Sequence, residues 1–211
     1  MPTNISKHEE RVAIVATNVM LEGNLMLYLR RTKSSEREPG KWNIPSGGVR
    51  MGEELRTAAL REVREETGRP FEPQQIKELG DAQVSIAAKD GSEFTMRCYT
   101  FIIDARDSMS LKDVKLARKE HSAKAGLSLA DLKYQLHLIQ TENRLVDRAV
   151  EKVEEIRGRR HLDLTGADKI NILLNYDKIA RVKRHGIDAI EDDAYGSEGA
   201  SVAQEAAASG Q

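Results

Sequence analysis

The sequence predicts an α+β domain with a mixed or antiparallel sheet, and three patterns carry that prediction. Short segments with strand-like hydrophobic patterns lie on both sides of a single helix-forming segment. Asp90-Gly91 stands between two of these segments, and this dipeptide favours a hairpin turn. A second stretch with helical periodicity occupies the last third of the chain. Strands that precede and follow a helix in this way are typical of the α+β class.

The predicted strands follow a polar N-terminus. Residues 12–16 form an apolar, β-branched run that suits a buried strand. Residues 22–24 have the composition of a turn, and leucines alternate with other residues over 25–30, which predicts a hairpin. Residues 84–88 and 94–103 flank the Asp-Gly turn and predict a second hairpin.

The predicted helices differ in how clearly they end. Residues 53–67 contain no glycine or proline and stop at Gly68, a residue that favours the left-handed cap of a helix. Residues 139–156 carry apolar side chains at helical spacing, which predicts an amphipathic helix. A third stripe, three or four residues apart, predicts a helix that packs one face on the main domain; its members are Ile172, Tyr176, Ile179 and Val182.

Composition excludes several classes of protein. The 211 residues include 33 Lys and Arg and 34 Asp and Glu, so a net charge of −1 gives no global argument for binding nucleic acid or membrane. A single cysteine, Cys98, excludes an intramolecular disulfide framework. No apolar run approaches the roughly 20 residues of a membrane span, and the N-terminus lacks the apolar core of a secretory signal. We expect a cytoplasmic protein.

The chain divides into four predicted parts. Residues 1–10 form a flexible N-terminus and residues 11–158 the main domain, and residues 159–190 form a helical extension. Residues 191–211 form an acidic tail whose end is rich in Ala, Ser and Gly, and we expect it to be disordered.

Acidic side chains occupy positions of the first helix where apolar ones are expected. On a helical wheel, Glu62, Glu65 and Glu66 continue the apolar stripe that begins at Leu55. Three carboxylates so close together repel one another, and a hard divalent cation such as Mg²⁺ would relieve that repulsion. The alternative is a solvated helix with an ordinary ion pair between Arg61 and Glu65.

The surrounding residues resemble the Nudix box, G-x5-E-x7-R-E-U-x-E-E-x-G-U, in which U is aliphatic. The matching residues are Gly47, Glu53, Arg61, Glu62, Val63, Glu65, Glu66 and Gly68. Two positions depart from the pattern, since Arg69 replaces the last aliphatic residue and Ser46 stands where many members have a glycine. Neither departure removes a carboxylate.

The resemblance extends over roughly residues 12–132. Residues 40–45 are similar to the strand and loop that lead into many Nudix boxes, and Glu120-His121 is similar to the later glutamate segment of the family. Membership implies an α/β/α sandwich with a mixed sheet. Most of the last third of the chain lies outside the resemblance.

The resemblance also implies roles for residues of the box. It implies that Glu62, Glu65 and Glu66 bind Mg²⁺, with Mn²⁺ as an alternative, between the chain and a substrate diphosphate. Arg61 corresponds to the arginine that orients a glutamate. The catalytic base, or a further metal ligand, is left open between Glu53 and Glu120, and Glu53 also suits the first turn of a helix for electrostatic reasons.

Other residues would contact the substrate phosphates. Gly47 and Gly48 allow the backbone to approach phosphate oxygens. Arg30 is a candidate for a phosphate contact, although Arg30 and Arg31 point to opposite faces of a strand, so only one of them can face the site. His121 is expected to be a loop histidine rather than a metal ligand.

The function implied by the resemblance is Mg²⁺-dependent hydrolysis of a pyrophosphate bond in a nucleoside diphosphate derivative. Residues 42–45 resemble MutT-type enzymes that act on nucleoside triphosphates, oxidised ones included. Hydrolysis of ADP-ribose, an NDP-sugar or a dinucleoside polyphosphate is the alternative within the family. The alternative of another class is a nucleotide sensor whose basic residues 157–184 bind nucleic acid, and residues 139–156 could also form a homodimer. We expect binding neither to nucleic acid nor to a membrane.

Overall fold

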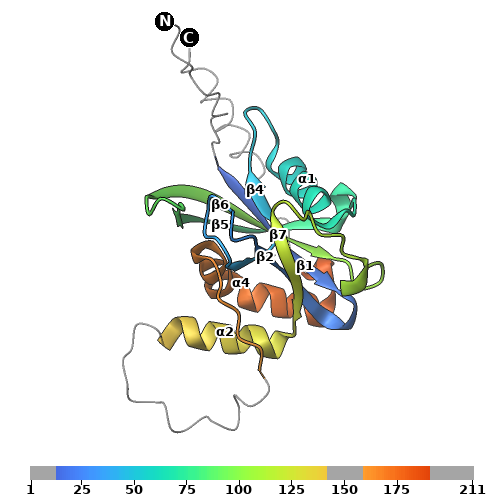
Figure 1. Cartoon of the computed structure of the whole chain (residues 1–211). Helices are drawn as coiled ribbons and strands as arrows, with labels where there is room; N and C mark the ends of the chain where they lie inside the picture. The colour runs from blue at the N-terminus through green and yellow to red at the C-terminus, as the bar shows by residue number, and fades with distance from the viewer. Residues whose placement is uncertain (1–12, 142–158, 191–211) are drawn as a thin grey trace, which may run out of the picture.

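The computed structural model describes residues 13–141 and 159–190, and these residues form a mixed sheet between two layers of helices (Figure 1). The strands are β1 (Ile14–Leu21), β2 (Leu25–Arg31), β3 (Trp42–Asn43), β4 (Ser46–Gly48), β5 (Ile76–Ala87), β6 (Glu93–Asp104) and β7 (His121–Leu127). The helices are α1 (Leu55–Thr67), α2 (Leu129–Thr141) and α4 (Gly166–His185). The α+β sandwich with a mixed sheet predicted from the sequence is confirmed.

β1 and β2 separate near the start of the segment that resembles the Nudix box. β1 pairs with β2 in antiparallel fashion next to their turn, at Met20–Met26 and Leu21–Leu25. Farther along, β3 pairs with β2 and β4 pairs with β1, so the short strands lie where the two long ones separate. On its other side β1 runs parallel to β6, which pairs with β5. The residues that join β3 to β4 are therefore anchored to both sides of this division.

β1 is buried along its whole length because helices cover both faces of the sheet. Val15 and Val19 point to the side of α1 and pack with its Val63. Ile14 and Met20 point to the opposite side, in the cluster that contains α2 and α4. Alternate residues of one strand thus belong to two cores, as the two-residue period of a strand requires.

The prediction of residues 12–16 as a strand was too short, because two polar residues interrupt the apolar run. Thr17 and Asn18 are each 1% exposed. The Asn18 amide donates to the carbonyl of Phe101 and to the side chain of Asn171 in α4. These contacts satisfy the buried amide, so the strand continues to Leu21.

α1 ends where the sequence predicts and begins two residues later. Gly68 has a φ of 72° and its N–H donates to the carbonyl of Arg64, which ends the helix in a left-handed cap. Glu54 caps the N-terminus by accepting hydrogen bonds from the N–H groups of Arg56 and Thr57. Glu54 therefore has the electrostatic role at the first turn that the sequence analysis considered for Glu53.

The residues after 158 form part of the second helical layer. α4 packs its buried Ile172, Ile179 and Val182 on the sheet, as their spacing predicts. β3 is bridged to residue Leu164, just before α4. The predicted helical extension therefore contributes directly to the core and contacts the strand that leads into the box.

Several predictions concern residues outside those described. α2 begins ten residues before the predicted helix of residues 139–156, and residues 142–158 lie outside the described part. The predicted flexible N-terminus (residues 1–10) and disordered tail (191–211) also lie outside it. Among the residues that the structure describes, no helix combines the length and the apolar character that crossing a bilayer requires.

Candidate functional site

Arg61 is the centre of the carboxylate cluster on α1. Its guanidinium donates two hydrogen bonds to Glu53, at 2.7 and 2.8 Å, and one to Glu62 at 2.6 Å. It also donates to the carbonyl of Gly48 at 3.0 Å and reaches Glu65 at 3.5 Å. Because these bonds use the fixed fork of the guanidinium, Arg61 holds the residues just before α1, the middle of α1 and strand β4 in one arrangement.

Glu53 is bound too tightly to Arg61 to be a strong proton acceptor. The paired hydrogen bonds from Arg61 lower the pKa of the Glu53 carboxyl, and the N–H of Arg50 donates a further bond at 3.0 Å. The side chain of Glu53 is only 12% exposed. The Glu53 carboxylate is therefore held against Arg61 and the backbone of Arg50, just before α1.

Glu62 lies directly against Gly47. A Cβ atom at position 47 would come within 2.1 Å of the Glu62 carboxyl carbon, so only glycine leaves room for the carboxylate in its present place. Burial raises the pKa of Glu62, and the Glu65 and Glu120 charges act in the same direction. Strand β4 and helix α1 are thus in close contact at the Glu62 carboxylate.

Glu66 is the most buried acid of the helix, at 3% exposure. One of its oxygens accepts a hydrogen bond from the N–H of Ser46 at 3.2 Å. Burial raises the pKa of Glu66 well above its usual range, although the nearby Arg31 charge opposes this. A buried carboxylate with so little compensation is costly unless a cation is close.

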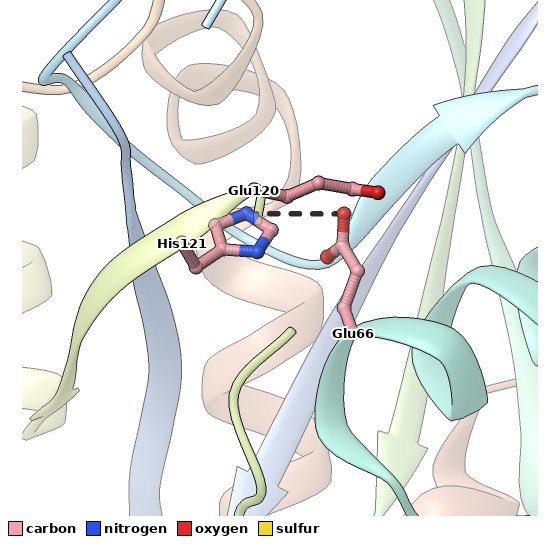
Figure 2. Close-up of side chains that lie close together, drawn as sticks. All are labelled: Glu66, Glu120 and His121. Atoms are coloured by element: carbon pink, nitrogen blue, oxygen red, sulfur yellow. Dashed lines mark ion pairs between the residues drawn. The ribbon is translucent and has the colours of Figure 1, made fainter. Parts of the chain in front are cut away.

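Glu120 and His121 face Glu66 from the start of β7 (Figure 2). Ligand atoms of these three residues lie within 4.8 Å of one another, and His121 Nε2 is 3.9 Å from a Glu66 oxygen. Burial, and then the Arg31 charge, lower the pKa of His121 to about 4, which leaves its imidazole neutral near pH 7. The structure places His121 in a strand beside the carboxylates, whereas the sequence analysis expected a loop histidine.

These carboxylates line one wall of a cleft of about 1010 Å³. Glu65, which is 51% exposed, lies on its rim, 3.6 Å from the Arg50 guanidinium. Other described residues that line the cleft come from β5, β6, the loop after β2 and the start of α4; they include Arg37, Glu38, Ile86, Phe94, Met96 and Asp168.

Arg31, and not Arg30, faces this cleft. Arg30 is exposed and donates to the carbonyl of Gly40 at 3.0 Å, and it does not line the cleft. A shift in the pairing of β2 with β7 lies between the two arginines. Arg31 lines the cleft, and its buried Nε has no hydrogen-bond partner among the described residues. The alternation of a strand allows one of the two to face the site, and the structure identifies which one.

The start of α4 contributes an acid to the cleft that was not predicted from the sequence. Asp168 is 3% exposed and accepts hydrogen bonds from the N–H of Ile44 and the hydroxyl of Thr165. Burial raises the pKa of Asp168 to about 7. An acid three residues after a capping threonine looks like an ordinary helix start, so no local signal in the sequence placed it at the cleft.

The donor set of the cleft fits a hard divalent cation. Glu62, Glu66 and Glu120 offer oxygen ligands, and Mg²⁺ prefers oxygen. The buried Nδ1 of His121 has no hydrogen-bond partner among the described residues. Burial raises the pKa of Glu66, and a cation beside it would favour its charged form.

Comparison with known proteins identifies the family. The model of the NUDIX domain matches residues 7–148. "Nudix hydrolase 27, chloroplastic" from Arabidopsis thaliana is 54% identical over 37 residues, which are 18% of this chain and 16% of that protein. "Nudix hydrolase 25" from the same plant is 53% identical over 30 residues, which are 14% of this chain and 17% of that protein. The alignments thus span under a fifth of either relative.

Solved structures agree on the fold. The MutT protein from Methanosarcina mazei Go1 has a TM-score of 0.51 at 22% identity, over 81% of this chain and 95% of that one. DR0079 from Deinococcus radiodurans has a TM-score of 0.52 at 15% identity, over 82% and 87% of the two chains. The family model matches most of the chain, and Arg61 of the Nudix box binds the box glutamate Glu53 in the structure. This chain therefore belongs to the Nudix family.

Proposed function

We propose that this chain hydrolyses a pyrophosphate bond in a nucleoside diphosphate derivative, and that its substrate is a nucleoside triphosphate, oxidised forms included. The observation that carries the proposal is the meeting of Glu62, Glu66 and Glu120 at one wall of a cleft large enough for a nucleotide. The reaction adds water to phosphorus and breaks the P–O bond of the anhydride. A nucleoside triphosphate would give a nucleoside monophosphate and pyrophosphate.

A divalent cation, Mg²⁺ or Mn²⁺, would be held by Glu62, Glu65 and Glu66, with Glu120 as a further ligand or base. When bound, it would neutralise phosphate charge and lower the pKa of a water molecule. Arg61 keeps the carboxylate of Glu62 in place through its 2.6 Å hydrogen bond. Gly47 leaves the room that this carboxylate needs.

Glu120 suits the catalytic base better than Glu53. Glu120 is exposed and lines the cleft, so its carboxylate is free to accept a proton from the attacking water. Glu53 does not line the cleft, and Arg61 lowers its pKa through two hydrogen bonds. We therefore assign proton acceptance to Glu120 and the orientation of Arg61 to Glu53.

The lining of the cleft combines charged and apolar side chains. Arg31 and Arg50 line it and can neutralise phosphate oxygens that the cation leaves free. Apolar side chains of Ile86, Phe94 and Met96 also line it, and they suit a planar base. This combination supports a nucleoside substrate over inorganic pyrophosphate.

The test is a substrate panel with the full chain. We would measure phosphate and pyrophosphate release from nucleoside triphosphates, an 8-oxo-purine triphosphate, ADP-ribose, NDP-sugars and dinucleoside polyphosphates, with Mg²⁺, Mn²⁺ or a chelator. The expected result is cation-dependent hydrolysis that is fastest with a nucleoside triphosphate. Preference for another compound would correct the substrate, and hydrolysis of none would refute the proposal. Glu22→Gln, which changes an exposed acid away from the cleft, is the matched control for Glu66→Gln.

A further inference from the structure

The loop between β2 and β3 forms the rim of the cleft and is attached to the far hairpin. The N–H of Glu38 donates to the carbonyl of Ala87 at 3.1 Å, and the N–H of Lys89 donates to the carbonyl of Glu36 at 2.7 Å. The guanidinium of Arg37 lies 5.1 Å from the centre of the Phe94 ring. The loop is therefore attached to the β5–β6 hairpin where both line the cleft.

The side chain of Glu38 turns away from solvent. Glu38 is 7% exposed, and one of its oxygens accepts a hydrogen bond from the N–H of Gly166 at 2.9 Å. Lys41, on the same loop, lies 3.9 Å from that oxygen and is 39% exposed. The buried hydrogen bond is thus the stronger of the two contacts, because the ion pair is long and hydrated.

The backbone at Glu38 adopts a conformation that its contacts must maintain. Its φ is +39°, in the left-handed region that side chains other than Gly, Asn and Asp rarely adopt. A glutamate with this φ is retained only when the surroundings compensate for the strain. The hydrogen bond to Gly166 and the backbone bond to Ala87 are among the compensating contacts, and the N–H of Lys41 donates a third bond to the carbonyl of Glu38 at 3.3 Å.

Gly166 begins the helix whose first turn lines the cleft. Ala167 and Asp168 follow it directly, and both line the cleft. Two hydrogen bonds join the same turn to β3 and to Ile44, which follows β3. The N–H of Thr165 donates to the carbonyl of Trp42, and the N–H of Ile44 donates to the carboxylate of Asp168. Glu38 therefore adds a third attachment, and it is the one that includes the rim loop.

We propose that Glu38 is a positioning residue: by binding the N–H of Gly166, it fixes the rim loop to the start of α4 and so keeps the cleft shaped for substrate. The kinetic part of this inference rests on the proposed function. The Glu38 carboxylate binds Gly166 and lies near Lys41, and its partners among the described residues include none of the α1 carboxylates, so its loss should weaken substrate binding more than it slows the chemical step.

The kinetic test compares Glu38→Gly with Glu38→Gln, using ATP, GTP, CTP and UTP with Mg²⁺. Glycine removes the hydrogen-bond acceptor and tolerates the positive φ, so a loss in Glu38→Gly cannot come from added backbone strain. Glutamine keeps an acceptor oxygen of similar reach. For the triphosphate hydrolysed fastest, Glu38→Gly should raise KM about tenfold with kcat within threefold, and Glu38→Gln should stay within twofold of the natural chain.

A second measurement needs no substrate. Hydrogen exchange of the Gly166 amide, followed by NMR, should accelerate at least tenfold in Glu38→Gly and stay within threefold in Glu38→Gln. Glu22→Gln removes an exposed carboxylate elsewhere and should change neither exchange nor KM. The melting temperature of each variant shows whether the fold is retained.

Three results would overturn the inference: unchanged exchange at Gly166 in Glu38→Gly, a KM within twofold in that variant, or a Glu38→Gln variant as impaired as Glu38→Gly. The last would mean that charge, and not the hydrogen bond, is what counts. A natural chain that hydrolyses neither the four triphosphates nor the 8-oxo-purine triphosphate of the substrate panel would refute the nucleoside triphosphate assignment and the kinetic part together. The exchange measurement would still decide whether Glu38 holds the start of α4.

Discussion

Gly47→Ala tests whether the close contact between Gly47 of β4 and the Glu62 carboxylate is required for catalysis. An alanine Cβ would lie 2.1 Å from both the carboxyl carbon and one oxygen of Glu62, and 2.3 Å from the other oxygen. Ordinary contact begins near 3.4 Å, so the carboxylate must retreat by about 1.3 Å. The backbone itself is not an obstacle, because Gly47 is not among the residues with positive φ.

That displacement has a predictable size of effect. Moving a catalytic group by about 1 Å can lower the rate about 100-fold, which is about 2.7 kcal/mol of transition-state stabilisation. The clash involves the far end of a flexible side chain, so the melting temperature should fall by only a few degrees. We therefore expect kcat for the best substrate to fall about 100-fold in a folded protein.

A double-mutant cycle shows whether the effect acts through Glu62. With Glu62→Ala in place, the Cβ at position 47 has room, so adding Gly47→Ala should change kcat by less than twofold. The assay is steady-state pyrophosphate release at saturating Mg²⁺, with thermal unfolding measured in parallel. An equal loss from Gly47→Ala in both backgrounds, or near-normal kcat in the single variant, would refute the reasoning.

The remaining predictions concern buried acids and the C-terminal region. Glu66→Gln should lower kcat at least about 100-fold, while its melting temperature without metal holds or rises because a neutral amide replaces a buried charge; near-normal turnover would contradict this. Burial raises the pKa of Asp168 to about 7, so the folded chain keeps a proton that the unfolded chain releases from about pH 4 upward. The stability this provides is full below about pH 4 and is lost as pH rises through about 7; urea titrations should show a flatter pH dependence in Asp168→Asn. Residues 157–184 should show no salt-sensitive binding to duplex DNA or RNA when micromolar protein is followed by fluorescence anisotropy between about 50 and 200 mM salt. Tight binding that is lost over that range of salt would favour the nucleotide sensor that binds nucleic acid. Deletion of residues 196–211 should leave melting temperature and turnover unchanged, and a loss of several degrees would show that this segment docks.

Local patterns predicted the parts of the site that lie within one element. The helical wheel placed Glu62 and Glu66 on the face of α1 that packs toward the sheet, and the structure has both of them at the cleft. Gly68 ended the helix as its backbone freedom predicts. Spacing along one helix is enough for these inferences because a helix fixes the direction of each side chain.

Contacts between distant segments were beyond the sequence. The alternation of side chains along β2 allowed either Arg30 or Arg31 to face the cleft. In the structure Arg31 lines the cleft, and the pairing of β2 with β7 shifts between these two residues. Asp168 reaches the cleft because its carboxylate binds the N–H of Ile44, a residue 124 positions away. A single sequence contains no local signal for such a contact, so the contribution of α4 to the cleft appears only in the fold.

The parallel pairing of β1 with β6 has a consequence for how the molecule folds. Parallel neighbours cannot be joined by a tight turn, and here residues 22–92, with the whole Nudix box among them, lie between the two strands. Closing so long a stretch costs chain entropy before the pairing can compensate for it, which slows folding. The carboxylate cluster is therefore completed only when contacts of high sequence separation have formed. A substitution in β1 or β6, far from the chemistry, should delay the appearance of activity during refolding together with that of the native sheet.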